Sequence, residues 1–276
     1  MAAVILSPGL PAMALQPTPP TPCFVPSALT EPFMHQSANA TMRVTRRRSP
    51  QSFASWSKRR WLSPAPICDP TKACSATARI FLDLGYTIDE FIAPCTAGLG
   101  SKAGPLVFQF PPQGRDATRN PDLWVNRLYR FLRELPPGFL YAVEIRDPEL
   151  FTPRFLMCLK TAGVQFCVAS HARMPPPARQ MIEATAVLGE GPLIARWSLH
   201  SGFKYEVAKA RYFPFDRLVD EDPDCRAALA AASLRAIAGG HAAFIVVNNK
   251  AEGSSPLSIE KLAALITDVE SHAATA

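Results

Sequence analysis

The sequence predicts an α/β fold built on a parallel sheet, and three observations support this prediction. Short apolar runs recur from about residue 104 onward, each of the length expected for strands buried on both faces. Segments with helical spacing and helix start signals lie between these runs. Strand and helix therefore alternate along the chain, which implies parallel strands joined by helical crossovers.

Five segments are predicted as strands because each is a short apolar run bounded by turn residues. They are residues 104–110, 139–145, 164–169, 192–197 and 243–248.

Four predicted helices begin where a capping residue precedes proline, a pair that favours the first helical turn. The first begins at Asn120 and continues at helical spacing to the prolines at 136 and 137. The second is expected to open at Asp147 and to close near Gly163, because glycine commonly ends a helix. The third is expected to open at Asp222 and the last at Ser255.

Charge and proline content divide the chain near residue 66. Residues 1–60 carry seven basic side chains and one acidic side chain, whereas the remainder carries 22 of each, so the formal net charge of +6 belongs to the N-terminal segment. That segment has neither helical nor strand periodicity, so we expect residues 1–66 to be a disordered, Pro- and Arg-rich arm. Residues 67–272 are the expected folded domain. Its balanced charge predicts no nucleic-acid binding through the globular part.

Cysteine usage and hydropathy indicate a cytoplasmic protein without a membrane partner. The seven cysteines are odd in number and form no C-x-x-C pair, which argues against a disulfide framework or a zinc ribbon. No apolar run approaches the ~18 residues of a membrane span. The glycine motif at 98–103 precedes a strand instead of opening a helix, so no dinucleotide site is expected. We expect no metal and no cofactor, and the sequence does not fix the oligomeric state.

Polar residues at the ends of the first two predicted strands form one half of a candidate site. Glu144 and Arg146 share a face of their strand, and barrels place their chemistry at the carboxyl ends of strands. The pair is either part of a site or a structural ion pair that ties the strand end to its neighbour. Gln109, at the end of the preceding strand, either completes a polar ring or is an ordinary strand-end amide.

The later strands supply the other half of the candidate site. Arg196 could fix a carboxylate or phosphate through its rigid fork, and His200 could move a proton near pH 7. The alternative for His200 is a satisfied structural histidine. Asn248, Asn249 and Lys250 follow the last strand, where they could orient hydroxyl groups and balance an anion. Asparagines at a strand end can equally satisfy the loop backbone.

Four segments together resemble the YecE-like family, a domain of unknown function with a TIM-barrel-like (β/α) fold. They are residues 104–112, 143–148, 195–200 and 244–258. The resemblance covers about residues 80–270 and relates Arg196 and His200 to an Arg-x-x-His-like family motif, although this chain has wider spacing. It implies a barrel of which about five of the eight strands are recognisable.

The family's opening motifs have no counterpart in residues 1–66, so the N-terminal strands are expected to be lost or replaced. If five strands form the sheet, the strands at 104–110 and 243–248 are expected to have unpaired edges.

Two hypotheses of function follow. The first is an enzyme that acts without cofactor on a small polar or anionic substrate, with Glu144 and His200 as acid–base pair and Arg196 as anion clamp. The second is a non-catalytic binding or regulatory module on the same scaffold, because fold does not fix function. An inactive truncated copy is a third alternative.

Overall fold

The computed structural model describes residues 2–7, 41–43, 81–200 and 203–274. Its centre is a seven-stranded sheet, whose strands are β1 (Ala2–Ser7), β2 (Thr41–Arg43), β3 (Leu106–Gln109), β4 (Tyr141–Glu144), β5 (Gln165–Ser170), β6 (Leu193–Trp197) and β7 (Ala243–Val247). Their order across the sheet is β2-β1-β7-β6-β5-β4-β3. The five predicted strands are confirmed to within two residues at each end, and β3 to β7 are mutually parallel, as expected.

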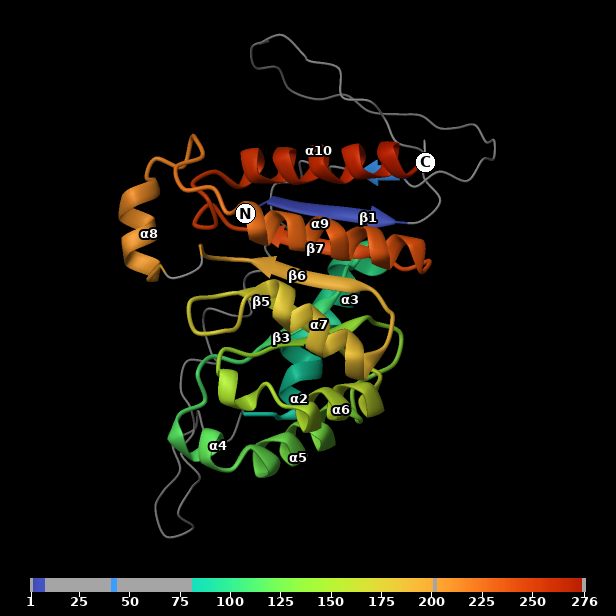
Figure 1. Cartoon of the computed structure of the whole chain (residues 1–276). Helices are drawn as coiled ribbons and strands as arrows, with labels where there is room; N and C mark the ends of the chain where they lie inside the picture. The colour runs from blue at the N-terminus through green and yellow to red at the C-terminus, as the bar shows by residue number, and fades with distance from the viewer. Residues whose placement is uncertain (1, 8–40, 44–80, 201–202, 275–276) are drawn as a thin grey trace.

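The helices alternate with the parallel strands, which confirms the predicted α/β class. In Figure 1 the α10 helix lies beside β1 at one end of the sheet, and α5 lies at the opposite end. The helical segments are α2 (Leu84–Thr87), η2 (Ile88–Ile92), α3 (Ala93–Leu99), η3 (Gly100–Lys102), α4 (Arg115–Arg119), α5 (Pro121–Leu132), η4 (Pro148–Leu150), α6 (Pro153–Ala162), α7 (Pro177–Leu188), α8 (Tyr205–Tyr212), α9 (Pro223–Ala238) and α10 (Ser255–Ala274).

Three of the four predicted helix starts are correct, and one is wrong. Asp222 caps α9 by accepting a hydrogen bond from the Cys225 backbone N–H. The helix expected to open at Asp147 begins instead at Pro153, because the Thr152 hydroxyl accepts from the Phe155 N–H and caps α6 there. Only a single 3-10 turn follows Asp147. The end of α6 is as predicted, with the residue after it, Gly163, in the left-handed conformation (φ 68°) that favours glycine.

The N-terminal segment contributes two strands, which the sequence analysis did not anticipate. Strand β1 pairs antiparallel with β7, from Ala2 opposite Val247 to Leu6 opposite Ala243, and β2 pairs with β1. The expectation of an unpaired edge at 243–248 is therefore wrong. Most of residues 1–66 lies outside the described residues, so the proposed division of the chain near residue 66 stays a prediction.

Within the described ranges the sheet is open, with β3 and β2 as its edge strands. β3 corresponds to the strand predicted at 104–110, and it is an edge strand, as expected. An open, largely parallel sheet covered by helices is compatible with a TIM-barrel-like fold but is not a closed barrel.

The two faces of the sheet differ in how they are packed. Alternate side chains, such as Phe108, Val143 and Ile245, belong to the large core between sheet and helices. The opposite face, here called the inner face, carries a small apolar cluster of Ala142, Cys167 and Ile194, with Val107, Leu140 and Phe244 packed against it. The alternation of side chains along a strand fixes which polar residues share this inner face.

Candidate functional site

The ends of β3, β4 and β6 bring polar side chains together on the inner face, although β5 lies between β4 and β6. Gln109 ends β3 directly opposite Glu144, which ends β4. Arg196, from β6, donates hydrogen bonds from Nη1 to the Gln109 Oε1 atom (2.7 Å) and to the Glu144 carboxylate. Parallel strands place their carboxyl ends at one edge, so three segments that are distant in sequence converge here.

Arg146 completes this group, which we call the carboxyl-end cluster: Gln109, Glu144, Arg146 and Arg196. The Nε atom of Arg146 donates to the Glu144 Oε1 atom (2.6 Å), and Nη2 contacts the same oxygen. The Glu144 side chain is fully buried, and those of Arg146 and Arg196 are 12% and 9% exposed. Four of the eight residues predicted for the site are thus in direct contact.

Small residues on β5 make this contact possible. Strand β5 lies between β4 and β6, so Arg196 must pass over β5 to reach Glu144. The residue beside Arg196 in register is Ala169, and the preceding inner-face residue is Cys167. Both are buried and short. A bulkier side chain at either position would occupy the space through which the guanidinium extends.

The electrostatics of the cluster keep Glu144 ionised. Burial alone raises the pKa of a carboxyl group, but the charges of Arg146 and Arg196 and their hydrogen bonds outweigh burial and hold the pKa of Glu144 below its ordinary value. The pKa of Arg196 is shifted upward, since the attraction of Glu144 exceeds the effect of burial. Two guanidinium cations therefore share one carboxylate, and the cluster carries a net charge of +1.

Both guanidinium groups retain hydrogen-bonding capacity. The described hydrogen bonds of Arg196 use Nη1, and those of Arg146 use Nε and Nη2. Each guanidinium carries five N–H donors in a planar fork. Donors on both arginines thus remain for a ligand that accepts hydrogen bonds, and the net charge favours an anion.

His200 and Lys250 form a second group beyond the ends of β6 and β7. The His200 N–H donates to the Lys250 carbonyl oxygen (3.1 Å), and the His200 ring meets Phe203 edge-on at 5.1 Å between centroids. The Lys250 ammonium lies 4.2 Å from the centroid of the Tyr205 ring, a favourable cation–π geometry. Lys250 therefore contacts α8 through Tyr205, and His200 contacts Phe203 just before this helix. These contacts are distinct from those of the carboxyl-end cluster.

The two asparagines after β7 have different surroundings. Val247 belongs to the helix-side core, so alternation places Asn248 on the inner face. The Asn248 Oδ1 atom accepts from the Lys250 N–H (3.1 Å). Asn249 points to the helix side, where its Oδ1 accepts from both the Ser255 N–H (2.9 Å) and the Ser255 hydroxyl (2.7 Å) at the start of α10. These contacts give Asn249 a structural role in the loop, the alternative that its sequence context left open.

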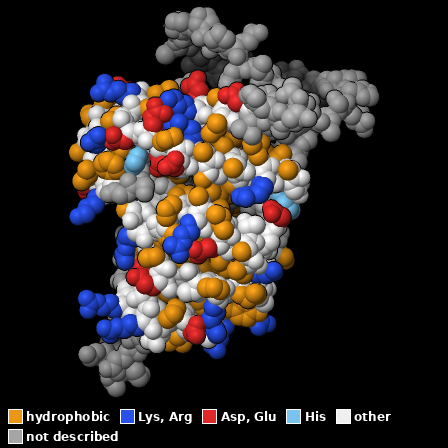
Figure 2. Space-filling view, in the orientation of Figure 1, with side chains coloured by type: hydrophobic (Ala, Val, Ile, Leu, Met, Phe, Trp, Pro, Cys, Tyr) orange, Lys and Arg blue, Asp and Glu red, His pale blue; other side chains and the backbone are white. Residues whose placement is uncertain are grey.

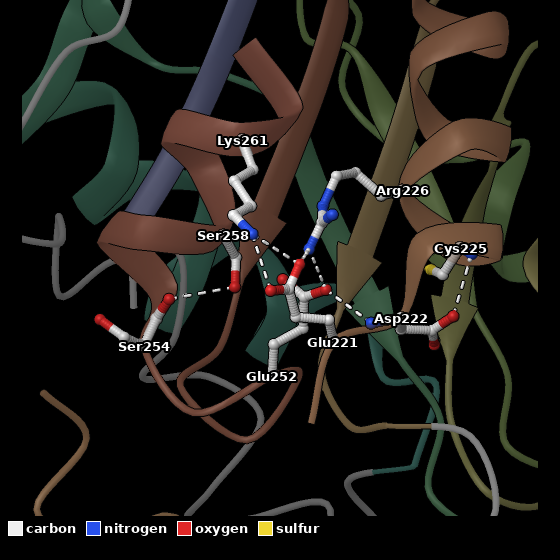
Figure 3. A network of polar contacts seen from close by, with 8 residues as sticks. All are labelled: Glu221, Asp222, Cys225, Arg226, Glu252, Ser254, Ser258 and Lys261. Carbon is white, nitrogen blue, oxygen red and sulfur yellow. Dashed lines mark hydrogen bonds and ion pairs between the residues drawn. The ribbon is translucent and has the colours of Figure 1, made fainter. Parts of the chain in front are cut away.

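A second ionic group, which we call the helix-side network, is built on buried Glu252 and Arg226 and lies between α9 and α10 (Figure 3). Arg226 of α9 contacts the carboxylates of both Glu252 and Glu221. Lys261 of α10 contacts Glu221 at 2.7 Å. The Glu252 side chain is fully buried, and its Oε1 atom also accepts from the Asp222 N–H (2.7 Å). The network pairs two acids with two bases and holds both helices against the loop after β7.

Sequence reasoning did not identify the helix-side network, although one signal was present. Gly253 follows Glu252 at φ 121°, and a side chain there would come within 2.4 Å of the Arg217 carbonyl oxygen. The glycine thus allows the 217–222 loop to pack directly on the chain beside Glu252. The sequence shows the glycine but not the distant segment that approaches it.

Surface and cluster observations bear on the predicted partners. On the face shown in Figure 2, basic and acidic side chains are interspersed over the described residues. In the described part of the chain no group of three or more His, Cys, Asp or Glu side chains could hold a metal ion. No helix among those residues is long and apolar enough to cross a membrane. The predictions about nucleic acid and location in the cell stay predictions.

The fold and the cluster define the class: an open α/β sheet protein with a basic polar cluster at the carboxyl ends of its parallel strands. A family model described as "Protein of unknown function DUF72" matches residues 72–275, so the chain belongs to this family. The predicted relationship to a domain family of unknown function is confirmed. No curated protein matches the chain.

Two crystal structures of a DUF72 family protein from Enterococcus faecalis V583 are similar to this chain. The first, at 2.52 Å resolution, has 15% sequence identity and a TM-score of 0.43 over 67% of each chain. The second, at 3.10 Å resolution, has 15% identity and a TM-score of 0.42 over 64% of this chain and 63% of that chain.

Proposed function

We propose that the carboxyl-end cluster binds the carboxylate or phosphate group of a small polar molecule. The observation that carries this proposal is the charge of the cluster, because Arg146 and Arg196 are nearly buried and share the single carboxylate of Glu144. A charge removed from water without a partner is costly. An anionic ligand would supply the missing partner, and the planar fork of arginine suits both carboxylate and phosphate.

Glu144 serves this proposal as a positioning residue. Its two carboxylate oxygens hold one guanidinium each, so the remaining donors of Arg146 and Arg196 are oriented before a ligand arrives. Such preorganisation reduces the entropy that binding must overcome. Gln109 fixes the same Nη1 atom of Arg196 from the other side and restrains it further.

A catalytic role is the narrower form of the proposal, with Glu144 and His200 as the acid–base pair and no cofactor. The lowered pKa of Glu144 favours the ionised carboxylate at neutral pH, which can accept a proton but has none to donate. Under this hypothesis Glu144 is the base and His200 the acid. The alternative function, a non-catalytic binding or regulatory module, requires the anion site but neither an acid nor a base.

Thermal melts in the presence of anions test the binding proposal. Phosphate and citrate, added at constant ionic strength with chloride as reference, should raise the Tm of the full chain, because a ligand that binds only the folded state stabilises it. Arg196→Met should abolish this increase. Arg179→Met is the matched control, since Arg179 forms an exposed pair with Glu183 on α7. An increase that survives in Arg196→Met would refute the proposed site.

A further inference from the structure

His171 lies at the carboxyl end of β5, between the two strands that supply the charged residues of the cluster. Ala169 and Cys167 are inner-face residues of β5, so the alternation of side chains places His171, two residues after Ala169, on the same face. The intervening residue, Ser170, points to the other side, where its hydroxyl donates to the Leu199 carbonyl oxygen (2.5 Å).

The turn after β5 fixes the position of the His171 ring. The Nδ1 atom of His171 accepts a hydrogen bond from the Arg173 backbone N–H (3.3 Å), and the His171 carbonyl oxygen accepts from the Met174 N–H (2.9 Å). The Arg173 guanidinium contacts the buried carboxylate of Asp147 (3.3 Å), which also accepts from the Gln113 N–H (2.6 Å). The turn is thereby attached to the loop after β3.

The charge environment keeps this ring neutral. Burial and the positive charges of Arg146 and Arg173 lower the pKa of His171 to about 4, although Glu144 acts in the opposite direction. A neutral imidazole holds a single proton, and since Nδ1 accepts a hydrogen bond, that proton lies on Nε2. The ring therefore carries an N–H donor on the inner-face side at the carboxyl end of β5, within electrostatic range of Arg146 and Glu144.

We propose that His171 is a ligand-contacting residue of the anion site, where its neutral ring donates a hydrogen bond from Nε2 to the anion held by Arg146 and Arg196. This inference rests on the proposed function and adds a residue to it. The preferred ligand presents an anionic group with at least three acceptor positions, two for the guanidinium groups and one for the imidazole. A phosphate or phosphate ester meets this requirement better than a carboxylate does.

The first test compares His171→Met with His171→Gln in phosphate titrations of the full chain at pH 7.5. The amide nitrogen of Gln can replace Nε2 as a donor, whereas Met has no donor. A hydrogen bond to a charged group predicts that His171→Met weakens phosphate binding by about tenfold and that His171→Gln restores most of the loss. The control is His241→Gln, in the turn before β7 at the opposite end of the sheet.

The outcomes separate this inference from the proposed function. Phosphate binding that depends on Arg196 but is unchanged in His171→Met would overturn the role of His171 and leave the anion site standing. A wild-type chain that binds no phosphate would overturn both. A merely structural role for His171 would lower the Tm in both variants without the selective recovery of affinity in His171→Gln, and this result would also overturn the inference.

A second measurement uses the wild-type chain and does not depend on whether the variants fold. Nitrogen-15 NMR of the histidine rings should show His171 as the Nε2–H tautomer between pH 5 and 8, with a shift of its Nε2 resonance when phosphate is added. A ring protonated on Nδ1, or one that titrates with an ordinary histidine pKa in the presence and absence of phosphate, would overturn the inference.

Discussion

The carboxyl-end cluster and the helix-side network are both built on a fully buried glutamate, yet their charges differ. Glu144 is shared by two arginines, so its cluster carries an excess positive charge. In the helix-side network, Arg226 and Lys261 match Glu221 and Glu252 one for one. The helix-side network has no excess charge for a ligand to neutralise, although its Arg226 Nε and Glu252 Oε2 atoms are buried without a hydrogen-bond partner. The carboxyl-end cluster has an excess positive charge at strand ends, and we propose that this charge binds an anion.

The largest expected effect comes from breaking the balanced network. Arg226→Met leaves Glu252 buried without its cation, and removal of one partner of a buried pair typically costs about 3–5 kcal/mol. Urea denaturation should show this loss of stability, and phosphate should restore none of it beyond its effect on the wild-type chain. Specific recovery by phosphate would mean that the helix-side network is also an anion site.

Glu144→Gln is the corresponding change in the unbalanced cluster. It leaves two nearly buried guanidinium groups without a carboxylate and should cost about 3 kcal/mol, the lower end of the range because Arg146 and Arg196 reach some solvent. In contrast with Arg226→Met, part of this loss should be recovered in phosphate, since an anion can take the place of the carboxylate. Equal recovery in the two variants would remove the distinction between the clusters.

Lowering the pH is expected to reduce the stability of the folded chain by less than these two substitutions do. The pKa of Glu144 is lowered in the folded state, so the unfolded chain binds more protons and stability falls as the pH drops below about 4.5 toward the folded pKa. The stabilisation from Glu144 is fully present at neutral pH. The wild-type chain should therefore lose more stability between pH 5 and 3 than Glu144→Gln does, as measured by urea melts. Parallel losses in both proteins would contradict the assigned ionisation.

Lys261→Met should have the smallest effect. The contact of Lys261 with Glu221 is about half exposed on both sides, and exposed ion pairs contribute about 0–1 kcal/mol. The denaturation midpoint should change little compared with that of Arg226→Met. A loss similar to that of Arg226→Met would show that the network acts as one cooperative unit.

The strands of the parallel sheet could be predicted because the sequence signals that define each strand lie within that strand and its flanking residues. Short apolar runs and capping residues act within a few positions, so five strands and three helix starts could be located from sequence. The start of α6 was misplaced because two proline signals, at residues 148 and 153, lie five residues apart and the Thr152 cap determines which one begins the helix. The pairing of β1 with β7 joins segments about 240 residues apart, and no local pattern reports it.

The site was predictable only in part, for the same reason. Alternation placed Glu144 and Arg146 on one face, but the sequence does not show that Arg196 crosses β5 to reach them, since this depends on the small side chains of Ala169 and Cys167. His171 was not predicted as a site residue, because its spacing from His200 and His241 does not fit a metal site and a single histidine has no other pattern to interpret. Its charged surroundings form only when β4, β5 and β6 lie side by side in the folded sheet.

The central claim is that the carboxyl-end cluster binds an anion. Isothermal titration calorimetry, with phosphate added to the wild-type chain and to Arg196→Met, tests it most directly. At constant ionic strength the wild-type chain should bind phosphate at one site. Arg196→Met should bind about tenfold or more weakly, because it loses at least one charge-assisted hydrogen bond of about 1.5–3 kcal/mol. Equal affinities in the two proteins, or the absence of binding to the wild-type chain, would contradict the assignment of the carboxyl-end cluster as an anion site.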